Sequence, residues 1–377
     1  MTISTPITGD LLYVEIEEDL RTSLRALLDK RCDWQSVLSR TESGDTSNRD
    51  LWHTLARDLG FAGIPVPEDL GGAGGAWREA AVVAEELGRA VAPIPFLGSA
   101  GIATALLLEL GDTELLLDLA SGASTVALAV PFATAPGVVV PTVDARDGHL
   151  HGAVHGVADV GAADTLLVPT EAGLYAVTTG AESVTVTESV SLDMTRPVAD
   201  IVLEGAPGRL VASGGPALDG ALVAALRVGA MLLASEQLGL AQRCLEMTVE
   251  YVKARRQFAR LLGSYQALKH RLADLWVSIT EARAVARYAA ECVSIGSPDL
   301  PVAVALAQAV CSEVAQQAAE ECIQLHGGIG FTWEHPAHLY LKRAKANAIG
   351  LGTVDQHRTA LASLVELPGP ATVAGAN

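Results

Sequence analysis

The sequence predicts an α+β protein with a helical N-terminal region, a middle β-barrel or sandwich domain and a C-terminal four-helix bundle. Leucine and alanine recur at helical spacing among alternating charges from residue 11 to about residue 117. Short segments rich in valine and threonine, separated by Gly, Asp and Pro, fill residues 125–214 and are typical of strands. Helical spacing returns from residue 217. We therefore expect domains at 1–122, 123–214 and 215–366.

Proline and glycine divide the helical regions. Pro65, Pro67 and the glycine-rich run 71–75 interrupt the N-terminal helices. In the C-terminal region, breaks near Gly263, residues 296–298 and residues 327–328 predict four or five helices. Residues 367–377 (LPGPATVAGAN) have too few large apolar side chains to pack, so we expect a disordered tail.

The composition is that of a globular protein of enzyme size. Half of the 377 residues are hydrophobic. The net charge of -18 argues against a surface that binds nucleic acid, because such a surface must attract phosphates. No apolar run reaches the roughly 18 residues of a membrane span, and the N-terminus lacks the pattern of a signal peptide. We therefore expect a cytoplasmic protein. The five cysteines are odd in number and contain no C-x-x-C pair, which favours reduced thiols over disulfides or zinc.

Several motifs occur together in one order along the chain. Residues 65–72 (PVPEDLGG) precede residues 85–89 (EELGR), and residues 255–266 read RRQFARLLGSYQ. Residues 324–334 (QLHGGIGFTWE) then lead to residues 351–353 (LGT). The set resembles the acyl-CoA dehydrogenase family, and the matches cover most of the chain. The resemblance implies bound FAD, an acyl-CoA substrate, an oligomer, and an electron-transfer flavoprotein as a possible electron acceptor.

The resemblance also assigns cofactor contacts. Arg255 matches an arginine that binds the FAD pyrophosphate, a dianion that needs arginine or backbone N–H donors. Phe258 is expected beside the adenosine part. Gln324 and the backbone of Gly327 and Gly328 are expected to approach the dinucleotide of the neighbouring subunit. Thr353, in the Gly-Thr pair, is the remaining candidate for cofactor binding.

The position that the resemblance gives to the catalytic glutamate is Leu351. A leucine side chain has no lone pair and cannot accept the α-proton of a thioester. Its backbone N–H remains a donor, so we expect that Leu351 could still polarise a thioester oxygen. Some relatives carry the base one helix earlier, which corresponds here to Gly229 or Ala230, and neither can act as a base.

Other titratable residues are weaker alternatives for chemistry. Glu236 lies two helical turns beyond Gly229 and is the nearest carboxylate, although a buried, hydrogen-bonded glutamate is the favoured interpretation. Asp355 belongs one turn away from the base position. His326 has no carboxylate partner in its motif and is interpreted as structural. His335 and His338 lack a third ligand, so no metal is expected.

The middle domain departs from the family pattern at residues 131–137 (PFATAPG), where the resemblance leads one to expect a loop that embraces the flavin ring. Loss of both the base and this loop resembles one subunit of the heterotetrameric α2β2 acyl-CoA dehydrogenases of actinobacterial sterol catabolism. The partner subunit would then supply the glutamate. Two alternatives stay open: a flavin monooxygenase of the same fold, and a non-catalytic structural or acyl-CoA-binding paralogue.

Overall fold

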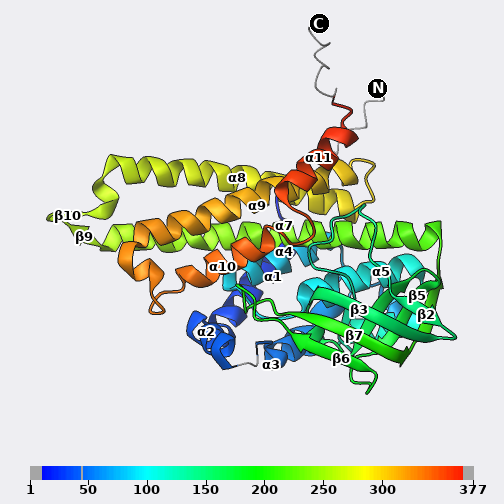
Figure 1. The fold of residues 1–377 in the computed structure, drawn as a ribbon. Coiled ribbons are helices and arrows are strands. Elements are labelled where there is room, and N and C mark those ends of the chain that lie inside the picture. Colours follow the sequence, from blue (N-terminus) through cyan, green and yellow to red (C-terminus); the bar gives the residue numbers. More distant parts are fainter. Residues whose placement is uncertain (1–10, 44–45, 368–377) are drawn as a thin grey trace, which may run out of the picture.

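The computed structural model describes residues 11–43 and 46–367 (Figure 1). The predicted tail lies outside these residues, except for Leu367. The N-terminal region is helical, as predicted. Its α-helices are α1 (Glu15–Arg31), α2 (Trp34–Ser43), α3 (Arg49–His53), α4 (Trp77–Ala90), α5 (Thr104–Leu110) and α6 (Thr113–Ala120). Short 3-10 or π turns are η1 (Thr54–Asp58), η2 (Phe61–Gly63), η3 (Glu68–Leu70) and η4 (Phe96–Ala103).

Side-chain caps set the start of two of these helices. The Asn48 side chain accepts a hydrogen bond from the N–H of Leu51 at the start of α3, and the Asp112 side chain accepts one from Leu115 at the start of α6. Each cap satisfies a backbone donor that the helix itself leaves without a partner. Helix α5 ends at its C-terminus with Gly111, which has a φ of 71° and adopts the left-handed conformation.

The middle domain is a sandwich of two four-stranded sheets. One sheet has the order β1-β4-β5-β8 and the other β2-β3-β7-β6, and β1 with β4 is the parallel pair. The strands are β1 (Val126–Leu128), β2 (Asp144–Arg146), β3 (His149–Ala158), β4 (Thr165–Thr170), β5 (Gly173–Thr178), β6 (Val184–Glu188), β7 (Val198–Pro207) and β8 (Arg209–Ser213), with a 3-10 turn η5 (Val160–Ala162). Buried side chains such as Leu150, Leu166 and Ile201 form a core between the sheets.

Three long helices dominate the C-terminal region. They are α7 (Pro216–Ala254), α8 (Gln266–Ser294) and α9 (Leu300–His326), and two shorter helices, α10 (Ala337–Asn347) and α11 (Val354–Leu364), follow. The chain turns between α7 and α8 through the hairpin β9 (Arg256–Gln257) and β10 (Arg260–Leu261) and the turn η6 (Leu262–Ser264). A further turn, η7 (Gly327–Phe331), follows α9. The helices end close to the predicted glycine breaks.

Helix α7 is the central helix of the fold. By length and composition it is apolar enough to cross a membrane, but 67% of its most apolar window is buried inside the protein, as in the core helix of a globular domain. It packs closely on α4: a Cβ added to Gly239 would lie 1.8 Å from the carbonyl oxygen of Glu85, and one added to Gly88 would lie 2.0 Å from that of Glu236. These two glycines allow the helices to touch backbone to backbone.

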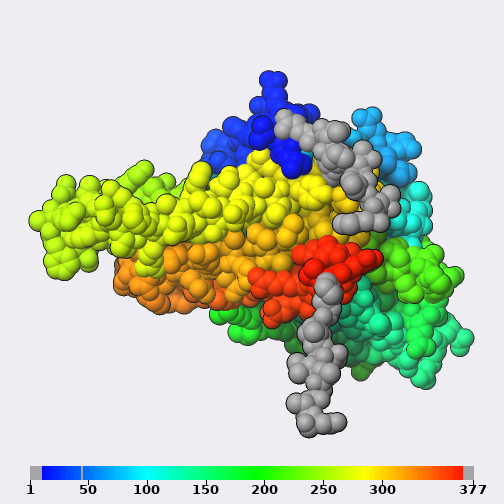
Figure 2. Space-filling model, turned by 90° about the horizontal axis from the view of Figure 1, so that it is seen from above, coloured from blue at the N-terminus to red at the C-terminus, as the bar shows by residue number. Residues whose placement is uncertain are grey.

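The ends of α7 and α8 extend beyond the rest of the protein and form an arm that carries the β9–β10 hairpin at its tip. Figures 1 and 2 show this arm on the left, in yellow-green. Between Glu250 and Asp274 the sequence has six lysines and arginines and no acidic residue. The arm is therefore a basic projection on a chain whose net charge is -18.

Candidate functional site

A groove of about 540 Å³ lies where the arm meets the end of α9. Four of the predicted cofactor residues line it: Arg255, Gln324, Gly327 and Gly328. The other lining residues are Tyr251, Gln257, Leu262, Leu268, Arg271, Leu325, His326 and Ile329. The structure thus brings together residues that lie about 70 positions apart in the sequence.

The ends of two helices shape this groove. Arg255 is the first residue after α7; its backbone is extended and its side chain is exposed. Gly327 ends α9 with a φ of 62°, which glycine adopts without strain. A Cβ added to Gly327 or Gly328 would meet no atom within 4 Å. The backbone there is open to a ligand, and Arg255 and Arg271 bring positive charge to the groove.

Phe258 does not line the groove but lies at the hairpin tip. Phe258 and Ala259 both have positive φ, 47° and 62°. Each costs an L-residue about 1–2 kcal/mol, a strain that the β9–β10 pairing supports. The turn holds the phenyl ring 88% exposed.

Three rings, those of Tyr251, His326 and His335, pack together at the groove. This cluster was not predicted from the sequence. His326 is 3% exposed, its ring centroid lies 4.4 Å from that of Tyr251 and 4.2 Å from that of His335, and its Nδ1 lies 2.7 Å from the Cys322 carbonyl oxygen. Burial lowers the pKa of His335 and of His338 to about 4, so both are neutral at pH 7. In the described part of the chain, no group of three His, Cys, Asp or Glu side chains is arranged to hold a metal ion.

Thr353 lies apart from the groove, at the start of α11. Its hydroxyl accepts a hydrogen bond from the N–H of Gln356, whose side chain in turn accepts one from the N–H of Thr353. This capping box explains a threonine at this position without a ligand. Asp355 follows in the first turn of α11 and is exposed.

Leu351, at the position that the resemblance gives to the base, is buried at 1% exposure. A Cβ added to Gly229 would lie 3.1 Å from the Leu351 side chain, so Leu351 faces one of the alternative positions that the resemblance gives to a base. Neither residue can accept a proton. Leu351 also has a φ of 54°, which makes the backbone at this turn strained.

The backbone N–H of Leu351 is not available to a thioester in this structure. It donates a hydrogen bond of 2.7 Å to the carbonyl oxygen of Phe132, in the middle-domain loop that departs from the family pattern. The phenyl ring of Phe132 lies against Gly350, since a Cβ there would come within 2.4 Å of it. We expected that the Leu351 N–H could polarise a thioester oxygen. In this conformation it cannot, because the N–H is already hydrogen-bonded to the Phe132 carbonyl oxygen.

The space beside Leu351 is also too small for an acyl group. The cavity there has a volume of about 30 Å³, which suits one or two water molecules. Its walls are Leu97, Gly98, Ile102, Leu128, Val130, Pro131, Phe132, Ala158, Asp159, Leu226 and Leu351. Asp159 is the one carboxyl group in this wall, and burial raises its pKa. The pocket of this chain is closed by its own side chains.

Gly350 offers a direct test of this packing. Its φ lies outside the left-handed region, so alanine can adopt the backbone conformation. Gly350→Ala should nevertheless cost about 1–3 kcal/mol of stability, because the new methyl group displaces the Phe132 ring. In a Phe132→Ala background the same change should cost little. Urea unfolding of both single variants and the double variant measures the difference, and equal costs in the two backgrounds would rule out the contact.

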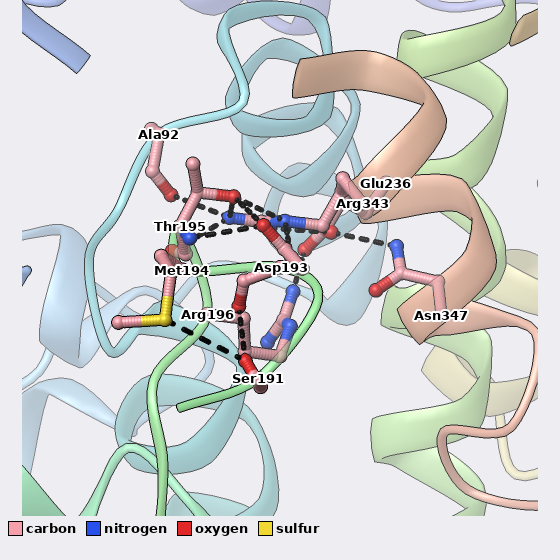
Figure 3. Close-up of polar contacts among 9 residues, drawn as sticks. All are labelled: Ala92, Ser191, Asp193, Met194, Thr195, Arg196, Glu236, Arg343 and Asn347. Atoms are coloured by element: carbon pink, nitrogen blue, oxygen red, sulfur yellow. Dashed lines mark hydrogen bonds and ion pairs between the residues drawn. The ribbon is translucent and has the colours of Figure 1, made fainter. Parts of the chain in front are cut away.

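Glu236 is buried at 6% exposure inside a network of charges (Figure 3). Its carboxylate pairs with Arg196 and with Arg343, the latter at 2.9 Å, and accepts a hydrogen bond of 2.9 Å from Asn347. Burial would raise the pKa of Glu236, but the two guanidinium groups outweigh it and hold the pKa at about 2. A carboxylate so acidic and so fully paired is a poor general base. Its surroundings are those of a buried, hydrogen-bonded glutamate, the interpretation that the sequence favoured.

The Glu236 network joins the middle domain to the bundle. Arg343, on α10, is 2% exposed and also contacts Asp193 at 2.8 Å and the Thr195 carbonyl oxygen at 2.8 Å. Asp193 and Thr195 belong to the loop between β6 and β7, whereas Glu236 belongs to α7. No sequence motif identifies this network, because its members are separated by up to 154 residues.

Comparison with known proteins agrees with the fold. Residues 15–117 match the acyl-CoA dehydrogenase N-terminal domain, and residues 220–365 match the C-terminal domain of the same family. Acyl-CoA dehydrogenase IpdE2 of Mycolicibacterium smegmatis is 37% identical over 90% of this chain and 95% of its own length. The chain belongs to the acyl-CoA dehydrogenase family.

Two solved structures extend the comparison within the acyl-CoA dehydrogenase family. The ChsE4–ChsE5 complex from Mycobacterium tuberculosis matches with a TM-score of 0.85 and 27% identity, covering 96% of this chain and 100% of that chain. A variant of the Tcur3481–Tcur3483 steroid ACAD matches with a TM-score of 0.82 and 28% identity, covering 93% and 98%. This acyl-CoA dehydrogenase chain is thus similar to members that are solved as complexes of two proteins.

The acyl-CoA dehydrogenase site of this chain divides into two unlike parts. The groove at Arg255 has a cation and open glycine backbone, which suit the pyrophosphate and adenosine end of FAD. The pocket at Leu351 is filled by Phe132 and does not fit a flavin ring or a thioester. The sequence indicated the first part. Closure of the second depends on the contact between Phe132 and Leu351, which lie in different domains.

Proposed function

We propose that this chain is one subunit of a heteromeric, FAD-dependent acyl-CoA dehydrogenase that acts on a CoA thioester, with sterol side chains as the substrate class. The observation that carries the proposal is the pairing of an open, basic groove at Arg255 with a closed pocket at Leu351. This chain would contribute only the outer part of an FAD site. A homologous subunit would complete the active site by adding the flavin-ring pocket and a glutamate base. The ChsE4–ChsE5 complex is a precedent for two-protein assembly in the family.

In this proposal the residues of the chain bind and orient the cofactor and perform no proton transfer. Bound FAD would supply the redox chemistry, as the acceptor of the hydride from the β-carbon of the thioester. Arg255 would neutralise the pyrophosphate, and Gln324 with the backbone of Gly327 and Gly328, which line the same groove, would approach the dinucleotide of the neighbouring subunit. Phe258, exposed on the hairpin tip, packs on the adenosine part at the interface. We further propose a cytoplasmic α2β2 assembly that passes electrons to an electron-transfer flavoprotein.

Purification of the chain with and without a partner tests the proposal. The partner is a homologue that carries glutamate before its Gly-Thr pair. Alone, the chain should hold little FAD and should not reduce ferrocenium with an acyl-CoA, whereas the co-expressed pair should hold FAD at the interface and do so. A flavin-loaded, active single chain would refute the need for a partner. Hydroxylation by reduced flavin and oxygen would instead support the monooxygenase alternative, and an assembly without flavin would support the non-catalytic one.

Arg255→Ala should lower the FAD affinity of the assembled enzyme about 10- to 100-fold. A charge-assisted hydrogen bond to phosphate contributes about 1.5–3 kcal/mol, and each 1.4 kcal/mol is tenfold in affinity. Lys253→Ala is the matched control, because Lys253 is an exposed cation at the same helix end and outside the groove. Flavin fluorescence during dialysis measures both. Equal losses in the two variants would point to general electrostatic attraction in place of a bound pyrophosphate.

A further inference from the structure

Contacts around Glu236 form a closed circuit that includes the pocket at Leu351. Glu236 pairs with Arg196, and the Arg196 guanidinium carbon lies 5.3 Å from the centroid of the Phe132 ring. The Phe132 carbonyl accepts the N–H of Leu351. Leu351 ends the turn that begins at Asn347, and the Asn347 side chain donates back to Glu236.

Glu236 therefore holds both sides of the closed pocket at once. Through Arg196 it holds the middle-domain loop that carries Phe132, because a guanidinium over an aromatic ring is attracted to its face. Through Asn347, whose contact with Glu236 is drawn in Figure 3, it holds the turn that carries Leu351. Among the described residues, Glu236 is the side chain that contacts both Arg196 and Asn347.

The turn itself has further support. The Gln237 side chain donates to the Asn347 carbonyl at 3.3 Å, and the Gln308 side chain donates to the Gly350 carbonyl at 3.2 Å. Nε2 of His357 lies 2.9 Å from the carbonyl oxygen of Leu351. These bonds fix the turn within the bundle. They do not reach Phe132, so Glu236 and Arg196 form the side-chain link between the bundle and the Phe132 ring, beside the direct contacts of Phe132 with Gly350 and Leu351.

We propose that Glu236 is a positioning residue that keeps the thioester pocket of this subunit closed, by holding Phe132 and the turn at Leu351 against each other. The role goes beyond the proposed FAD-binding function and does not depend on it, since every group in the circuit belongs to this chain. Its consequence is local: the N–H of Leu351 stays hydrogen-bonded to Phe132 for as long as the charge of Glu236 holds Arg196 in place.

Hydrogen exchange at the Leu351 amide tests the proposal in the full chain. Glu236→Gln keeps the shape of the side chain and removes its charge, so amides in residues 130–135 and 347–352 should exchange at least ten times faster. Glu246→Gln is the control, because Glu246 lies on the same helix and pairs with Arg89 away from the pocket. Unchanged exchange at Leu351 would overturn the proposal, as would equal acceleration of slow amides throughout the chain.

A second set of variants separates positioning from general support of the fold. If Glu236 acts through Phe132, Phe132→Ala should itself speed exchange at Leu351, and adding Glu236→Gln should speed it no further. Additive effects of the two substitutions would contradict the circuit. Should Glu236→Gln fail to fold, Arg196→Gln breaks the same link while Glu236 keeps Arg343 and Asn347 as partners. Arg196→Gln with unchanged exchange at Leu351 would count equally against the proposal.

Discussion

An Arg343→Met chain should lose about 3–5 kcal/mol of unfolding free energy. Methionine has nearly the length of the arginine stem but leaves the carboxylates of Asp193 and Glu236 buried without this cation, at 2% and 6% exposure. Removing one partner of a buried ion pair costs that much because the remaining charge is desolvated and unpaired. Urea unfolding at pH 7 measures the loss.

Arg358→Met provides the matched comparison. Arg358 also contacts a carboxylate, Glu313, at 2.6 Å, but both side chains are about half exposed. Exposed pairs contribute about 0–1 kcal/mol, so this variant should be nearly as stable as the parent. Similar losses in the two variants would show that the burial of Arg343 adds nothing to its contribution.

The buried network also predicts how stability changes in acid. The pKa of Glu236 is about 2 in the folded chain, below its usual value of 4.5. Its ionised form therefore stabilises the fold fully above the unfolded pKa, and this stabilisation is lost as the pH falls towards 2. Arg343→Met, which removes one of the two cations that lower this pKa, should flatten the acid limb of stability against pH.

Leu351→Glu should not turn the isolated chain into a dehydrogenase. The new carboxyl group would enter a cavity of about 30 Å³ walled by side chains such as Ile102 and Leu226, with Phe132 on the backbone N–H. We expect no ferrocenium reduction with an acyl-CoA and a stability loss of about 2–4 kcal/mol from burial of the polar group. A base without room for substrate has nothing to act on.

The pH dependence of the stability of the Leu351→Glu variant tests whether the new carboxyl group is buried. Burial should raise the pKa of the new carboxyl group above its unfolded value. The variant should then lose stability, relative to the parent, as the pH rises from the unfolded pKa towards the folded one. Leu351→Met is the control for shape and should change little. Acyl-CoA oxidation by the Leu351→Glu chain alone would contradict the closed pocket.

The fold and the groove could be predicted because their determinants are local. Helical and strand periodicity distinguish the three regions, and the glycines after α9 end it where the sequence predicts a break. Arg255, Gln324 and the two glycines each lie at a helix end, so short motifs carry them. Thr353 belonged to such a motif as well, but its hydroxyl caps α11 and lies away from the groove.

The closure at Leu351 could not be predicted in the same way. Phe132 reaches Leu351 from another domain, and the contact that matters is a backbone carbonyl, which every residue has. Glu236 was visible in the sequence as a carboxylate in an apolar helix. Its partners come from a loop 40 residues earlier and from α10, 107 residues later. Pairwise contacts over such separations leave no pattern in a single sequence.

The sequence by itself determined the acyl-CoA dehydrogenase fold, the residues that line the groove at Arg255 and the lack of a proton-accepting side chain at Leu351, since these follow from local periodicity and from side-chain chemistry. Only the tertiary structure decided what became of the space beside Leu351. There, packing between domains set Phe132 on the amide and Glu236 between two buried arginines, because desolvated charges and donors must find partners wherever the folded chain brings them together.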